Sequence, residues 1–201
     1  QNKNSIINTS GQKMTDKVKQ GKTAKRNGKE FEKILDNYFL YLKKIKVCVI
    51  EKTPEPFRYI RPLNANSYGM FIATFTKSAQ PDYKGTLVGG RAIVLEAKSV
   101  ASDRINLSVL TEQEKEDLIL YSQLGAISGV IVKSQQFKNI YYLPTDFFCN
   151  IYELTGFKHI KFENARGFIL KGIEENQING INKIVELNCM SNSDLLKIKC
   201  Y

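Results

Sequence analysis

Two carboxylates and one lysine near the middle of the chain have a spacing that suits phosphoryl chemistry. Asp82 follows a proline, and Glu96 and Lys98 stand two residues apart at the end of an apolar run. Because side chains alternate along a strand, Glu96 and Lys98 project from one face of the strand expected over 91–99. Asp82, on a bend marked by Pro and Gly, can supply the second carboxylate.

This set of residues suggests a magnesium site. Mg²⁺ prefers oxygen ligands and keeps several waters, so two carboxylates and a backbone carbonyl suit it. A neighbouring lysine can steady a developing hydroxide or the charge of a phosphate. In a simpler interpretation, Glu96 and Lys98 only form a salt bridge at the end of a buried strand. The spacing alone leaves both interpretations open.

The charge of the chain points to a polyanionic partner. Its 201 residues include 30 Lys and Arg against 20 Asp and Glu, which gives a net charge of +10. Residues 1–27 hold seven basic side chains and one acid, whereas residues 111–201 hold ten and eleven. Nucleic acid or another anionic surface is the favoured partner, and a basic protein without such a partner is the alternative.

Several protein classes are disfavoured by what the sequence lacks. No window approaches 18 consecutive apolar residues, and the first residues lack the apolar run of a signal peptide, so we expect no membrane association. The four cysteines form no C-x-x-C pair, and His159 is the single histidine. Zinc fingers, redox motifs and His-based catalysis are therefore disfavoured, and reduced thiols in a cytoplasm are favoured.

Periodicity and turn signals predict the elements that position these residues. Apolar side chains at helical spacing predict a helix over 29–44, and a T-x-x-E capping box predicts another from 111 to about 125. A short helix is expected over about 145–154. Strands are expected over 46–52, 57–61, 68–77, 91–99, 127–133 and 139–143. This order of elements predicts an α/β fold with a central mixed β-sheet flanked by helices.

The two ends of the chain carry weaker signals. Residues 1–27 are polar and lysine-rich, and we expect a flexible basic arm that either binds DNA phosphates or only aids solubility. Residues 28–201 are expected to form a single domain, with strands and loops over 157–201.

The residues around the carboxylates resemble a known family. The segment resembles the PD-(D/E)xK nuclease motif, and the chain is more closely similar to the RecU family of Holliday-junction resolvases of Gram-positive bacteria and their phages. The resemblance starts near residue 26, and its motifs lie within 28–150. They are Gly28-x-x-x-Glu32, Lys52-Thr53-Pro54-Glu55-Pro56, the segments 75–85 and 93–98, Gln113, Gly125 and Tyr141-Tyr142-Leu143.

The resemblance implies a restriction-endonuclease-like nuclease core and names its site residues. Asp82 and Glu96 would bind Mg²⁺ with the carbonyl of Ala97, and Mn²⁺ would substitute. Lys98 would orient or help to activate the attacking water. Two further residues would assist, namely Glu32 on the first helix and Gln113 in the first turn of the second.

The implied reaction is the paired hydrolysis of DNA phosphodiesters in a four-way junction, during recombination or repair. A homodimer is implied too, because resolving a junction needs two matching cuts. Basic side chains around the site would hold the phosphates of branched duplex DNA. They are Lys25, Arg26, Arg58, Arg61, Lys77, Lys84 and Arg91. The resemblance places this activity in the cytoplasm of a bacterial or phage-infected cell.

Two other functions stay open. In the family, the segment between the second and third strands is a protruding basic stalk that engages the junction centre, whereas residues 62–76 carry no charged side chain. One alternative is therefore a nuclease of the same fold that cuts linear or flapped duplex DNA. The other is a non-catalytic DNA-binding module, which the intact Asp, Glu and Lys set disfavours, because clustered carboxylates oppose DNA binding unless a metal bridges them.

Overall fold

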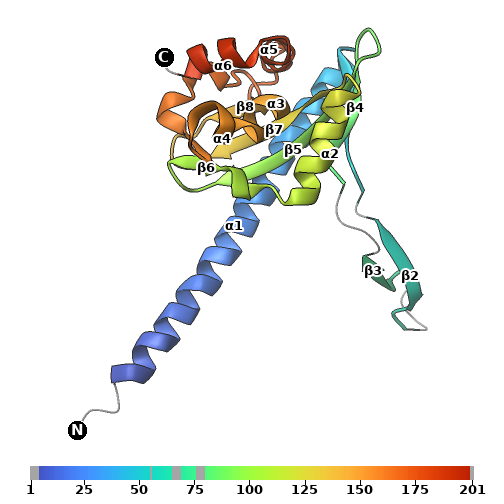
Figure 1. The fold of residues 1–201 in the computed structure, drawn as a ribbon. Coiled ribbons are helices and arrows are strands. Elements are labelled where there is room, and N and C mark those ends of the chain that lie inside the picture. Colours follow the sequence, from blue (N-terminus) through green and yellow to red (C-terminus); the bar gives the residue numbers. More distant parts are fainter. Residues whose placement is uncertain (1–4, 55, 65–68, 76–79, 200–201) are drawn as a thin grey trace.

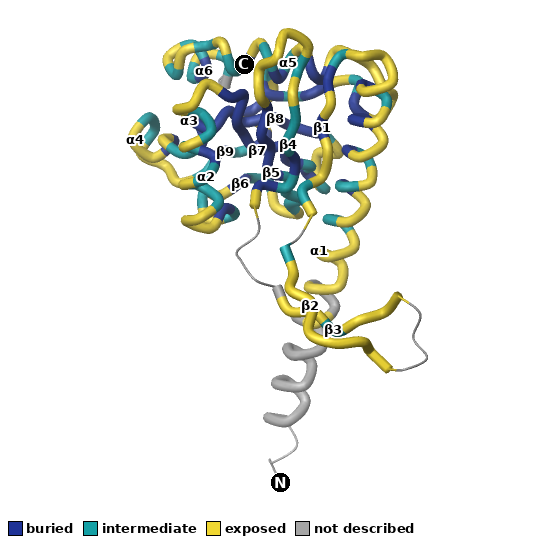
Figure 2. The backbone as a smooth tube through the Cα atoms, turned by 90° about the vertical axis from the view of Figure 1, so that its right-hand side faces the viewer, coloured by how far each residue is buried: buried dark blue, intermediate teal, exposed yellow. Residues whose placement is uncertain are grey.

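A computed structural model describes residues 5–54, 56–64, 69–75 and 80–199 of the chain. Five strands form a central sheet with helices on both of its faces, and two projections leave this body on the same side (Figure 1). Buried residues concentrate in the sheet and in the helix segments packed on it (Figure 2). The α/β class and the helix-flanked mixed sheet predicted from the sequence are confirmed.

The central sheet has the strand order β1-β4-β5-β7-β8. β5 and β7 are parallel, and the other neighbours are antiparallel, so the sheet is mixed. β7 is buried along almost its whole length, as expected for an interior strand. The strands are β1 (Cys48–Lys52), β4 (Tyr83–Leu87), β5 (Ala92–Val100), β7 (Ile127–Ser134) and β8 (Ile140–Pro144).

Helices cover the two faces of this sheet. α1 (Ser5–Lys44) and α5 (Asn179–Asn188) lie together on one face, where the backbone N–H of Ile181 donates to the Tyr38 hydroxyl at 2.8 Å. α2 (Glu112–Gln123) packs on the other face beside the short helix α3. The remaining elements are α3 (Thr145–Cys149), α4 (Ile151–Thr155), α6 (Asn192–Lys199), the small pair β6 (Arg104–Asn106) and β9 (His159–Lys161), and the 3₁₀ turns η1 (Leu107–Val109), η2 (Phe162–Asn164) and η3 (Arg166–Phe168).

The first helix is longer than predicted. The expected flexible arm over 1–27 is helical from Ser5 onward, because α1 runs without a break into the predicted helix. This segment has few large apolar side chains, but it also has no proline. Once the buried turns after Gly28 have formed, each preceding residue extends the helix by a hydrogen bond without a new nucleation cost. Residues 21–26 are exposed on this extension.

The C-terminal region was also predicted incorrectly, because α5 and α6 lie where strands and loops were expected. Ile181, Ile184 and Leu187 are spaced by three residues and are buried, so they form the apolar stripe of α5. The intervening Asn, Gly and Lys residues have low or neutral helix propensity and obscured this stripe. No helix within the described residues is long and apolar enough to cross a membrane.

β4 was expected to be a bend, and it is a strand between β1 and β5. Its polar sequence and Gly85 gave no strand signal, yet the glycine is what permits the pairing. A Cβ at Gly85 would lie 2.0 Å from the carbonyl oxygen of Val49 on β1. Gly89 and Gly90 lie in the turn that joins β4 to β5, and both have a φ of +88°, which glycine adopts without strain.

β2 (Phe57–Pro62) and β3 (Phe71–Phe75) form a separate two-stranded sheet, called the β2–β3 hairpin below. It projects from the body on the same side as the start of α1 (Figures 1 and 2). Every residue of β2 is exposed. The base of the hairpin is closed by a hydrogen bond of 2.8 Å from the Thr53 N–H to the Asp82 carbonyl.

Candidate active site

Asp82 and Glu96 lie side by side where β4 meets β5. Tyr83 pairs with Leu95 in the antiparallel register, which brings the preceding Asp82 opposite Glu96. The Asp82 backbone N–H donates to Glu96 Oε2 at 3.3 Å, and the Ala97 N–H donates to Asp82 Oδ2 at 2.9 Å. The structure therefore brings together the three residues that were predicted as metal ligands.

Lys98 joins this cluster from the same face of β5 as Glu96. Its Nζ lies 2.8 Å from Glu96 Oε1 and 2.9 Å from Glu114 Oε1. The salt bridge expected under the simpler interpretation is thus present. It does not account for Asp82, whose carboxylate is tied to the backbone of the same strand beside the pair.

Burial makes this arrangement of charges costly. Glu96 is only 3% exposed. Burial and the nearby charge of Asp82 raise the pKa of Glu96 to about 8, although Lys98 acts in the opposite direction. Burial alone would lower the pKa of Lys98, but the two glutamates outweigh it and raise that pKa. The Asp82–Glu96 pair consequently favours the binding of a cation.

The donor set fits Mg²⁺. Two carboxylates and the backbone carbonyl of Ala97, the residue after Glu96, leave several coordination positions to water and phosphate, as this ion prefers. Among the residues the structure describes, no group of three or more His, Cys, Asp or Glu side chains is placed to hold a metal.

Glu96→Gln is expected to stabilise the metal-free protein at pH 8. A carboxyl whose pKa is higher in the folded state binds more protons in that state than in the unfolded state. Glu96 therefore lowers the free energy of unfolding progressively as pH rises from about 4.5 to about 8. Melting in EDTA should show a Tm about 2–8 °C above wild type at pH 8 and a smaller difference at pH 5. Glu174→Gln, at an exposed carboxylate, is the control, and a lower Tm of Glu96→Gln at pH 8 would contradict this account.

Glu32 reaches the edge of the cluster from α1. Its Oε2 accepts from Lys52 Nζ at 2.6 Å, and its backbone carbonyl accepts from the Tyr83 hydroxyl at 3.2 Å. The hydrogen bond to Glu32 raises the pKa of Lys52, with smaller contributions from Asp36 and Asp82. Lys52, at the end of β1, is thus a member of the site that was not predicted, and its place in the motif after the first strand was the one available signal.

Gln113 lies in the first turn of α2, where it was predicted. It is exposed, and its Nε2 donates to Asp117 Oδ1 at 3.0 Å along α2. Its neighbour Glu114 contacts Lys98. The capping box with Thr111 was predicted from the T-x-x-E spacing and is confirmed, but the second contact of Glu114 was missed.

The predicted DNA-binding residues occupy different parts of the surface. Lys25 and Arg26 are exposed on the extension of α1, and Arg58 and Arg61 are exposed on β2. Both groups lie on the two projections that leave the body on the same side (Figure 1). Lys77 lies outside the described residues.

Lys84 and Arg91 are held by contacts with the body. Lys84 Nζ donates to the Tyr121 hydroxyl at 2.9 Å, and Arg91 Nε donates to the Gly125 carbonyl at 3.2 Å. Gly125 follows the end of α2, whereas Glu114 lies in its first turn, and a helix of 12 residues is about 18 Å long. Arg91 is therefore at the opposite end of α2 from Lys98, not beside the site.

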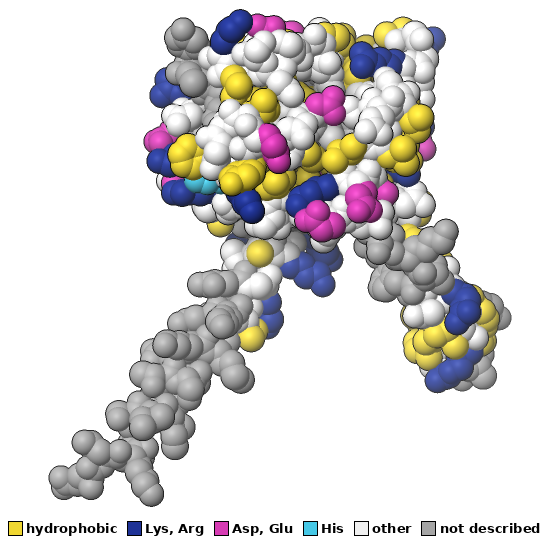
Figure 3. Space-filling model, in the orientation of Figure 1, with side chains coloured by type: hydrophobic (Ala, Val, Ile, Leu, Met, Phe, Trp, Pro, Cys, Tyr) yellow, Lys and Arg dark blue, Asp and Glu magenta, His cyan; other side chains and the backbone are white. Residues whose placement is uncertain are grey.

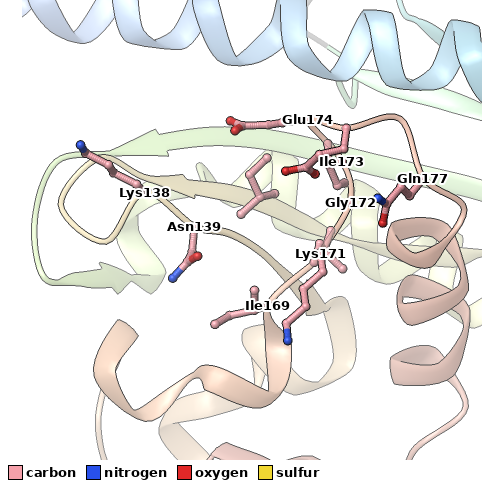
Figure 4. Close-up of a pocket in the computed structure, with 11 residues that line it drawn as sticks. Lys138, Asn139, Ile169, Lys171, Gly172, Ile173, Glu174 and Gln177 are labelled. Carbon is pink, nitrogen blue, oxygen red and sulfur yellow. The ribbon is translucent and has the colours of Figure 1, made fainter.

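A cavity of about 470 Å³ lies between the β7–β8 turn and the segment after η3 (Figure 4). None of the predicted site residues lines it. The carboxylate cluster instead lies at the base of the β2–β3 hairpin, where the Thr53 N–H donates to the Asp82 carbonyl. The cavity is lined by Lys138, Asn139, Ile140, Ile169, Leu170, Lys171, Gly172, Ile173, Glu174, Glu175 and Gln177.

Comparison with known proteins identifies the family. The family model described as "RecU: Recombination protein U" matches residues 26–186. Among solved structures, the chain is similar to Hjc of Archaeoglobus fulgidus, a Holliday junction resolvase from an archaeal hyperthermophile, with 16% identity over 60% of this chain and 74% of that chain and a TM-score of 0.36. No curated protein matches. The match to the family model spans most of the sequence, and the chain belongs to the RecU family.

Proposed function

We propose that this protein is a Mg²⁺-dependent endodeoxyribonuclease that resolves Holliday junctions by paired phosphodiester hydrolysis. The observation that carries the proposal is the pair formed by half-buried Asp82 and buried Glu96 with Lys98 beside it, which has the composition of a metal-assisted hydrolytic site. Membership of a family of recombination proteins supports a DNA substrate.

Each residue of the cluster would have its own role in hydrolysis. Asp82 and Glu96 would hold Mg²⁺, which supplies neutralisation of the charge on the phosphoryl oxygens. Lys98 stays protonated because its two carboxylate partners raise its pKa, so its ammonium can donate to the attacking water or to a phosphoryl oxygen. Glu32 and Lys52 border the site and limit where the DNA backbone can lie. The expected products carry 5′-phosphate and 3′-hydroxyl ends.

The β2–β3 hairpin supports a branched substrate. Phe57, Tyr59 and Phe71 are exposed on it, and the ring centroids of Phe57 and Phe71 are 5.4 Å apart. Figure 3 shows hydrophobic side chains alternating with Lys and Arg on this projection. Aromatic surfaces stack on bases that are unpaired or splayed, and a junction centre offers such bases whereas a continuous duplex does not. The hairpin would therefore engage the junction through apolar contacts and through Arg58 and Arg61.

We also propose a homodimer that acts in the cytoplasm of a bacterial or phage-infected cell. A four-way junction is resolved by two cuts in opposite strands, and one protomer offers one carboxylate cluster among its described residues. Two copies related by a two-fold axis would place two such clusters on the two-fold symmetric junction.

A cleavage assay tests this function against its alternatives. The protein is incubated with a mobile four-way junction and with a linear duplex of matched sequence, each with Mg²⁺ and with EDTA. Cleavage of the junction alone, with Mg²⁺ alone, is expected. Equal cutting of the linear duplex would contradict the resolvase function, and binding without cutting would contradict an enzymatic function.

Charge on the extension of α1 is expected to contribute to DNA affinity. In the double variant Lys25→Gln/Arg26→Gln, the slope of log K against log salt should become shallower by up to about 1.8, because each lost phosphate contact removes about 0.9. The double variant Lys138→Gln/Lys171→Gln removes the same charge beside the cavity of Figure 4 and should leave the slope unchanged. If the Lys25→Gln/Arg26→Gln variant keeps the same slope as the control variant, the extension of α1 does not contact DNA phosphates and is only a solubilising segment.

A further inference from the structure

One carboxylate in the first turn of α2 makes contacts in two directions. Glu114 Oε1 accepts from Lys98 Nζ at 2.9 Å. Its Oε2 accepts from the Thr111 N–H at 2.7 Å, while its own N–H donates to Thr111 Oγ1 at 3.2 Å. The two oxygens thus connect the start of α2 to the candidate active site on β5.

The helix cap alone does not require a carboxylate at this position. A glutamine in the third helical position completes a capping box as well as a glutamate does. The negative charge of Glu114 is matched by the Lys98 ammonium, and the Glu114 side chain is only 17% exposed at this contact. The Lys98 contact therefore accounts for a carboxylate at this position beyond what the capping box requires.

Lys98 gains a defined position from this second partner. A lysine side chain has four rotatable bonds, and its ammonium is a compact charge without a preferred direction of pairing. Glu96 and Glu114, on β5 and α2, hold the ammonium from two elements at 2.8 and 2.9 Å. Since Glu96 is also tied to Asp82, Glu114 is the partner that lies outside the carboxylate pair.

We infer that Glu114 is a positioning residue, which fixes the Lys98 ammonium beside the Asp82–Glu96 pair and couples its placement to the start of α2. The inference rests on the proposed function for its effect on catalysis. A group that is held in place contributes more to a reaction than one that must be ordered at each turnover, so the loss of Glu114 should lower the chemical rate rather than the affinity for DNA.

The test compares two variants that separate the two roles of the residue. Glu114→Gln keeps an oxygen for the Thr111 N–H but removes the charge that holds Lys98. Thr111→Ala removes the hydroxyl half of the cap but leaves the carboxylate facing Lys98. In single-turnover cleavage of a four-way junction, Glu114→Gln is expected to be about 10- to 100-fold slower, with an unchanged junction Kd. Thr111→Ala is expected to melt at a lower temperature but to cleave at nearly the wild-type rate.

A second readout does not depend on activity. The ammonium of Lys98 is observed by ¹⁵N–¹H NMR of the metal-free full chain, with its signal assigned by its loss in Lys98→Met. Two ion pairs slow the exchange of ammonium protons with water, so a resolved signal is expected in wild type and in Thr111→Ala. In Glu114→Gln this signal should broaden or shift.

The outcomes separate this inference from the proposed function. Absence of cleavage by the wild-type protein would overturn the proposed function, while the NMR signal would still decide whether Glu114 holds Lys98. Cleavage by Glu114→Gln at the wild-type rate would overturn the positioning role. An equal loss of rate in Thr111→Ala would also overturn it, because the cap would then explain the effect. An unchanged Lys98 signal in Glu114→Gln would overturn it as well, because Glu114 would then not hold the ammonium in place.

Discussion

Asp82→Asn is expected to slow junction cleavage by about 10³-fold or more while leaving junction affinity nearly unchanged. The amide oxygen can still accept from the Ala97 N–H, so the local backbone should keep its geometry. The substitution removes one of the two charges that would hold Mg²⁺, and metal-assisted charge neutralisation is worth several kcal/mol in the transition state. Single-turnover cleavage of an end-labelled junction measures the rate, and binding in EDTA measures the affinity.

The matched control for this variant is Asp117→Asn. Asp117 is a carboxylate on α2 that contacts Gln113, so the change removes the same charge without touching the cluster. Its cleavage rate should stay within about twofold of wild type, since surface substitutions usually have small effects. Loss of junction binding in Asp82→Asn would indicate a structural role for Asp82, and an undiminished rate would exclude it as a metal ligand.

Removing two rings from the β2–β3 hairpin is expected to weaken junction binding by about 10²-fold. Each base stacked on an aromatic ring contributes about 1–3 kcal/mol, so Phe57→Ala/Tyr59→Ala should lose this amount even with partial engagement of the two rings. Binding to a linear duplex should change little, because its bases are already stacked on one another. Competition between a labelled junction and an unlabelled duplex measures the selectivity directly.

Tyr152→Ala/Phe157→Ala is the control for the hairpin variant. These two rings are 49% and 60% exposed on the body, against 55% for each ring on the hairpin. Sedimentation of both variants establishes whether the oligomeric state has changed. If the hairpin variant changes its oligomeric state, or weakens duplex and junction binding equally, the apolar surface does not recognise the junction centre.

The chemistry of the site could be predicted from the sequence more fully than its surroundings. Strand alternation placed Glu96 and Lys98 on one face of β5, and their contact bears this out. Asp82 was predicted as the second carboxylate from its place in the motif. No strand was predicted beside it, because the sequence of β4 gives no strand signal. Only the antiparallel pairing of β4 with β5, in which Tyr83 lies opposite Leu95, explains why Asp82 falls opposite Glu96.

The contacts that depend on packing could not be predicted. The capping box fixed the position of Glu114 on α2, but its contact with Lys98 depends on how α2 crosses the sheet. Arg91 was grouped with the site because it is close in sequence. Five residues of a strand span about 17 Å, which separates Arg91 from Glu96. The length of α1 was underestimated because a helix that continues from packed turns needs no apolar signal of its own.

Cleavage of a supercoiled plasmid that extrudes a cruciform tests the central claim most directly. With Mg²⁺, the wild-type protein should convert this plasmid to a linear form through two cuts in opposite strands at the cruciform, and should leave a plasmid without the inverted repeat intact. The Asp82→Asn variant should produce no linear form under the same conditions. A product that is only nicked once, or equal cutting of the plasmid that lacks the cruciform, would contradict junction resolution by paired hydrolysis.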